Sequence, residues 1–127
     1  MDKTLTELEG DDWGNAADDS TYLIRRSHQL RYVPISRLSI EGLRMLIGQE
    51  MGLPWLVGIA LDRLEICPCV EGDMYPGDLL QSVGMISRSY WKLHPDQESR
   101  LSSILAKAMK MECADNIDTQ YFASIQE

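Results

Sequence analysis

Long apolar runs are missing from the sequence. No stretch approaches the roughly eighteen apolar residues that a helix needs to span a membrane. The opening residues, "MDKTLTELEGDDWG", are acidic and polar, whereas a secretory signal has a basic start and an apolar centre. The sequence therefore predicts a protein that stays in the cytoplasm and has no membrane partner.

Cysteine is scarce, and its count is odd. Three cysteines argue against a disulfide framework. The "CPC" of residues 67–69 resembles a thiolate clip, but zinc needs two further ligands. The remaining candidates, Cys113, His28 and His94, have no recognisable spacing. We therefore expect ordinary buried or half-buried cysteines and no metal site.

Motifs for catalysis are also missing. The glycines are scattered and form no phosphate-binding loop, and no nucleophile motif surrounds Ser27, His28 or His94. The stretch "EGDMYPGD" lacks the ligand offsets of a calcium loop and contains Pro76. Two acids can in principle perform acid–base chemistry, but any chain this acidic satisfies that criterion. The sequence predicts neither an enzyme nor a bound cofactor.

Basic residues are few relative to acids. Twelve Lys and Arg residues stand against twenty Asp and Glu residues, giving a net charge of −8. Within residues 1–19, Lys3 is the only base among many acids. Such a chain repels nucleic acid phosphates, so we expect no direct nucleic acid partner. It attracts a basic protein and speeds the encounter, although negative charge also simply aids solubility.

Helical periodicity is what the sequence does contain. Ser39 is a good N-cap, and the apolar residues after it repeat at helical spacing, at Leu43, Leu46, Ile47 and Met51. Gly52 is expected to end this helix, and Pro54 to begin the next. That next segment, "PWLVGIALDRLEI", is apolar on nearly every side as far as Ala60, which is typical of a buried helix.

Three further segments predict helices. Ser20 can cap "TYLIRRSHQL", and "LLQSVGMI" carries another apolar stripe. Trp91 and Leu93 are expected to pack in the core, and Pro95 to open the last helix. The apolar face of that helix is predicted at Leu101, Ile104, Leu105 and Met109.

These patterns predict an all-α fold, a single compact domain of about five helices, because strand alternation is hard to find. We divide the chain into an acidic N-terminal segment (residues 1–19), a helical domain (residues 20–111) and a polar C-terminal tail (residues 112–127). The tail has no clear period, so we expect it to be mobile or loosely docked.

The stretch "EGDMYPGDLL" at residues 71–80 calls for its own explanation. Pro76 and Gly77 favour a turn or a helix start, and Asp78 complements the dipole of the helix that follows. A helix start does not explain Glu71, Asp73 or Tyr75.

Three segments together resemble the immunity proteins of bacterial contact-dependent growth inhibition systems. They are "LEGDDWG", "LSIEGLRMLIGQEMGLPWLV" and "EGDMYPGDLL", and the resemblance covers residues 8–105. Gly42, Gly58 and Cys69 depart from the residues that are common in that family. The resemblance implies a neutraliser that binds the toxin C-terminal domain of a large surface-exposed protein. Many such toxins are nucleases, commonly acting on RNA, and an acidic inhibitor suits the basic groove of a nuclease. A helical adaptor that binds another cytoplasmic protein is the alternative.

Two groups of residues follow from this hypothesis. The predicted toxin-binding residues are Asp11, Asp12, Glu71, Asp73 and Tyr75. The predicted structural residues are Trp13, Arg44, Gln49, Pro76, Gly77 and Asp78. Solvated acids explain the first group equally well, and the Tyr75 ring can instead pack in the core with its hydroxyl on a carboxylate. Trp13 is a core anchor or an interface residue, and Arg44 and Gln49 can pair with buried polar groups of the loop.

Overall fold

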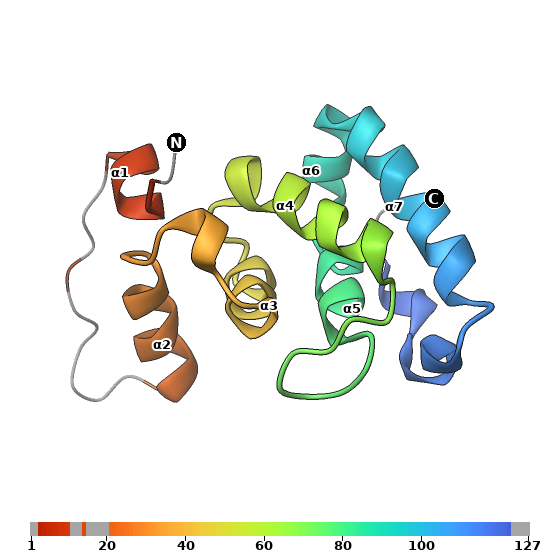
Figure 1. Cartoon of the computed structure of the whole chain (residues 1–127). Helices are drawn as coiled ribbons and strands as arrows, with labels where there is room; N and C mark the ends of the chain where they lie inside the picture. Colours follow the sequence, from red (N-terminus) through yellow and green to blue (C-terminus); the bar gives the residue numbers. More distant parts are fainter. Residues whose placement is uncertain (1–2, 11–13, 15–20, 123–127) are drawn as a thin grey trace.

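The computed structural model describes residues 3–10, 14 and 21–122. Within these residues the chain forms seven α-helices, five of them with seven residues or more, and two isolated β-bridges but no strand. The all-α prediction is confirmed (Figure 1). The elements are α1 (Leu5–Glu9), α2 (Tyr22–Leu30), η1 (Ile35–Arg37), α3 (Ile40–Gly48), α4 (Leu53–Ile66), α5 (Asp78–Gly84), α6 (Arg88–Leu93), α7 (Pro95–Ala108), η2 (Glu112–Asn116) and η3 (Thr119–Tyr121).

Helix α4 is the centre of the core, as its apolar sequence predicts. It packs against α3, α5 and α7, and α3 also packs against α5 and α2 (Figure 1). Leu56, Val57, Ala60, Leu61 and Leu64 of α4 are completely buried. The domain is therefore organised around one apolar helix, with amphipathic helices covering it.

Side-chain and backbone caps define the helix ends. Ser39 caps α3 as predicted, because its Oγ accepts a hydrogen bond from the Gly42 N–H at 3.0 Å. Helix α2 is capped by Thr21, whose Oγ1 accepts from the Ile24 N–H at 3.3 Å. Ser20, the predicted cap, lies outside the described residues.

Gly52 starts α4 and does not end α3. Helix α3 already ends at Gly48, and Gly52 is the N-cap of α4 with φ of 65°. A Cβ atom on Gly52 would lie 2.7 Å from Leu5 Cδ1. Both the left-handed backbone and the close approach of α1 therefore require glycine here.

Two apolar residues predicted in the core are exposed. Trp91 is fully buried and donates its indole N–H to the Ile86 carbonyl at 3.1 Å, but Leu93 is 78% exposed. Leu93 is the last residue of α6, where the chain turns into α7. Met109 is also exposed, at 43%, because α7 ends at Ala108 and Met109 is its C-cap.

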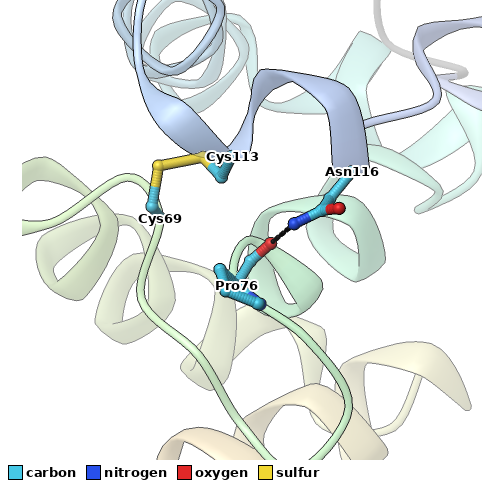
Figure 2. The surroundings of a disulfide bond; sticks show 4 residues. All are labelled: Cys69, Pro76, Cys113 and Asn116. Atoms are coloured by element: carbon cyan, nitrogen blue, oxygen red, sulfur yellow. Dashed lines mark hydrogen bonds between the residues drawn. A yellow bond between two sulfur atoms is a disulfide. The ribbon is translucent and has the colours of Figure 1, made fainter.

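Cys69 and Cys113 form a disulfide across a sequence separation of 44 residues (Figure 2). The prediction that the cysteines form no disulfide was therefore wrong, although an odd cysteine, Cys67, is left free and exposed. An odd count excludes complete pairing of the three residues, but it does not exclude one bond.

Residues 112–122, here called the C-terminal segment, pack against the helices. Cys113, Ile117 and Phe122 are buried. The Gln81 side chain bonds the backbone of Asp118 twice, donating to its carbonyl at 3.2 Å and accepting from its N–H at 2.7 Å. The expectation of a loosely docked tail was therefore wrong for these residues. The division at residues 19/20 and 111/112 stays a proposal.

Candidate partner-binding loop

Residues 71–77, here called the acidic loop, connect α4 to α5. The loop extends past the N-terminal end of α5 (Figure 1). Glu71 and Pro76 form an antiparallel β-bridge that closes the loop, and the Gly77 N–H donates to the Val70 carbonyl at 3.3 Å. Helix α5 begins at Asp78 with Gly77 as its N-cap, so Pro76 belongs to the loop and not to the first turn.

Asp78 holds the loop backbone in place. Its carboxylate is almost completely buried, at 2% exposure. Oδ1 accepts a hydrogen bond from the Gly72 N–H at 2.7 Å, and Oδ2 accepts from the N–H groups of Met74 and Tyr75 at 3.0 and 3.4 Å. The first turn of α5 also favours a negative charge at this position. One buried carboxylate thus satisfies three backbone donors of a short loop.

Helix α3 holds the loop from the other side. Glu41 Oε1 accepts a hydrogen bond from Arg44 Nε at 2.7 Å and from the Asp73 N–H at 2.9 Å. The hydrogen bond from Arg44 lowers the pKa of Glu41 against the opposing effect of burial, and the Asp73 N–H lowers it further. Arg44 Nε also lies 3.9 Å from Asp78 Oδ2, so one guanidinium serves both carboxylates.

The loop passes directly over Glu41, and a glycine allows this. A Cβ atom on Gly72 would lie 2.7 Å from Glu41 Oε1 and 3.3 Å from Glu41 Cα. The second of these contacts is with backbone, which cannot move aside as a flexible side chain can. In the sequence "EGD", one acid therefore stands on each side of the glycine that lets the loop pass over Glu41.

The side chains of the loop point outward while its backbone is held. Glu71 and Asp73 are exposed, and neither carboxylate makes a hydrogen bond or ion pair with another residue that the structure describes. Met74 is 64% exposed, and Tyr75 is half-buried. The arrangement presents two carboxylates, a thioether and part of a phenol ring on a fixed backbone.

The sequence profile of the CDI immunity proteins matches residues 7–101 of this chain. The chain belongs to this family. CDI is contact-dependent growth inhibition, and membership implies that this immunity protein neutralises a cognate CDI toxin. It also favours an inhibitor over an enzyme. Searches of curated proteins and of solved structures gave no significant match.

The matched region contains the whole acidic loop and both of its supports. Arg44, Pro76, Gly77 and Asp78, four of the predicted structural residues, lie together there. Gln49 does not join them, because it is exposed at the C-cap of α3, the opposite end from Glu41. The predicted residues Asp11, Asp12 and Trp13 lie outside the described residues.

Sequence reasoning missed the role of Glu41. The available signal was its i,i+3 spacing from Arg44, which is typical of an ion pair on one helix face. The bond to Asp73 spans 32 residues and had no local signal.

The described residues contain no group of three or more His, Cys, Asp and Glu side chains that could hold a metal ion. Among the helices that are described, none has the length and apolar character of a membrane span.

Proposed function

We propose that this immunity protein acts in the cytoplasm by stoichiometric binding to a toxin nuclease, an RNase in the favoured case. In this proposal Glu71 and Asp73 face a basic surface of the toxin, with Tyr75 beside them. Asp11 and Asp12 remain part of the proposed surface on the basis of sequence alone.

The observation that carries this proposal is the pair of exposed carboxylates on a held backbone. Asp78 and Glu41 together accept four backbone N–H groups of the loop, so the loop pays little conformational entropy on binding. A nuclease needs a cationic groove for phosphates, and an inhibitor with a net charge of −8 complements it. Opposite potentials raise the association rate more than they raise affinity.

The expected affinity follows from the need to neutralise a toxin inside the cell. An inhibitor that protects a cell at low concentration requires a Kd of about 1 nM or lower, which corresponds to about −12 kcal/mol. An interface of about 1,600 Å² is sufficient when a few anchors are well placed.

The test measures association kinetics with the purified toxin domain at low and high salt. Asp73→Asn is expected to lower the association rate constant at low salt and to equal the wild type at high salt, where charges are screened. Asp96→Asn is the matched control, because Asp96 is an exposed acid in the first turn of α7, outside the loop. A wild-type association rate that does not depend on salt would refute charge complementarity.

Stoichiometry requires a separate measurement. Titration of RNA cleavage by the toxin is expected to reach zero activity at one immunity protein per toxin. Complete inactivation of excess toxin by a small amount of the immunity protein would instead indicate an enzyme.

A further inference from the structure

An open pocket lies where the acidic loop meets the C-terminal segment. Its volume is about 630 Å³, within the range of small-ligand pockets and ample for one large side chain. Pro76 lines it from the loop, Met111 from the chain after α7, and the Cys69–Cys113 disulfide closes one side.

The two walls of the pocket are tied together. The disulfide joins them covalently, and the Asn116 side-chain amide donates to the Pro76 carbonyl at 3.0 Å (Figure 2). Because thiols stay reduced in a reducing cytoplasm, the hydrogen bond is the connection that counts in the proposed setting, and a pocket whose walls are connected before binding loses little entropy when it is filled.

The pocket combines an apolar lining with acids on the elements that form it. Met111 is 41% exposed, and methionine adapts its shape to an incoming side chain. Glu112 also lines the pocket, and Asp115 is an exposed acid of the same η2 helix. Glu71 lies opposite Pro76 in the β-bridge, whereas Lys110 is the one base among the lining residues. This charge pattern favours an apolar group with cations beside it.

The lining residues of the pocket come from both inside and outside the part of the chain that matches the family profile. Pro76 and Cys69 fall within residues 7–101, whereas Met111, Glu112 and Asn116 lie beyond them. One wall thus belongs to the shared part of the family and the other to the part outside it. A site built in this way is suited to distinguishing one toxin from another.

We propose that this pocket receives one apolar anchor side chain of the cognate toxin domain, flanked on the toxin by Lys or Arg. The inference rests on the proposed function and deepens it. The loop acids steer the encounter, and the filled pocket determines how long the complex lasts. Anchors buried in pockets dominate interface energies, while rim charges act mainly on association.

The test measures dissociation of the purified toxin domain from single-residue variants. Met111→Ala is expected to raise the dissociation rate about tenfold, with an unchanged association rate and an unchanged melting temperature. Met111→Leu keeps the apolar volume and is expected to retain the wild-type dissociation rate. Met85→Ala is the matched control, because Met85 is 52% exposed at the C-terminal end of α5, whereas the pocket lies near its N-terminal end.

The outcomes separate this inference from the proposed function. Met111→Ala with a wild-type dissociation rate, together with slower association of Asp73→Asn, would overturn the pocket assignment and leave the proposed function standing. A wild-type protein that does not bind the toxin domain would overturn both. Met111→Arg gives a second reading, since it blocks the pocket and repels flanking cations, and normal binding of this folded variant would also overturn the assignment.

Discussion

Asp78→Asn tests whether the buried carboxylate of Asp78 holds the backbone of the acidic loop. Both oxygens accept backbone N–H groups, Oδ1 from Gly72 and Oδ2 from Met74 and Tyr75. Asparagine has the same shape but only one acceptor oxygen, and its amide nitrogen is a donor. Whichever way the amide is turned, at least one backbone donor then faces another donor inside a buried site.

The expected loss of stability follows from these bonds. A buried donor left without a partner costs about 1–3 kcal/mol, and the lost charge weakens the remaining bonds, so we expect about 2–3 kcal/mol in total. With an unfolding entropy of about 2.1 cal/mol/K per residue, a chain of 127 residues should lose about 7–11 °C in melting temperature.

The assay is thermal unfolding followed by circular dichroism, with amide hydrogen exchange of Gly72 and Met74 as the local readout. Asp73→Asn is the matched control, because it makes the same substitution in the same loop at an exposed carboxylate. We expect the control to melt within about 2 °C of the wild type, since surface substitutions usually change stability by less than 0.5 kcal/mol. Equal melting temperatures for the two variants would refute the structural role of Asp78.

Three further predictions test other contacts. Reduction of the Cys69–Cys113 bond is expected to lower the free energy of unfolding by about 4 kcal/mol in urea titration, from the chain entropy of a loop with 44 residues of separation, whereas Cys67→Ser should have no such effect. The pKa of Glu41 is lower in the folded protein than its ordinary value of 4.5, so the ionised carboxylate stabilises the fold at pH values above 4.5. This stabilisation is lost as the pH falls through the folded-state pKa, and Glu41→Gln should remove this part of the acid dependence of unfolding. Gly72→Ala is expected to destabilise the protein by about 1–3 kcal/mol in thermal unfolding, because the Cβ atom would press on the Glu41 backbone, and an unchanged melting temperature would contradict the crossing geometry.

Local patterns predicted the helices because their causes are local. Ser39 caps α3 through a hydrogen bond three residues away, and the apolar character of α4 as far as Ala60 predicts its place in the core. The position of Asp78 at the start of a helix was predicted for the same reason. Its larger role was not, because three loop N–H groups reach it only after the loop has folded back.

Contacts between distant segments gave no signal in the sequence. Phe122 is the only phenylalanine and lies in a polar stretch without a period, yet it is fully buried. The disulfide joins residues from two segments whose proximity depends on the packing of α4 against α7. The count of cysteines therefore misled, because pairing is decided by tertiary distance and not by number.

The disulfide and the proposed cytoplasmic site of action are compatible because the C-terminal segment has other attachments. Thiols in a reducing cytoplasm stay reduced. Burial of Phe122 contributes about 1.5–3 kcal/mol, and each of the two hydrogen bonds between Gln81 and Asp118 about 0.5–1.5 kcal/mol. Their sum is comparable to the roughly 4 kcal/mol expected from the disulfide. We therefore expect the segment to keep these contacts after reduction of the bond, and the walls of the pocket beside the acidic loop to be more tightly constrained when the bond is formed.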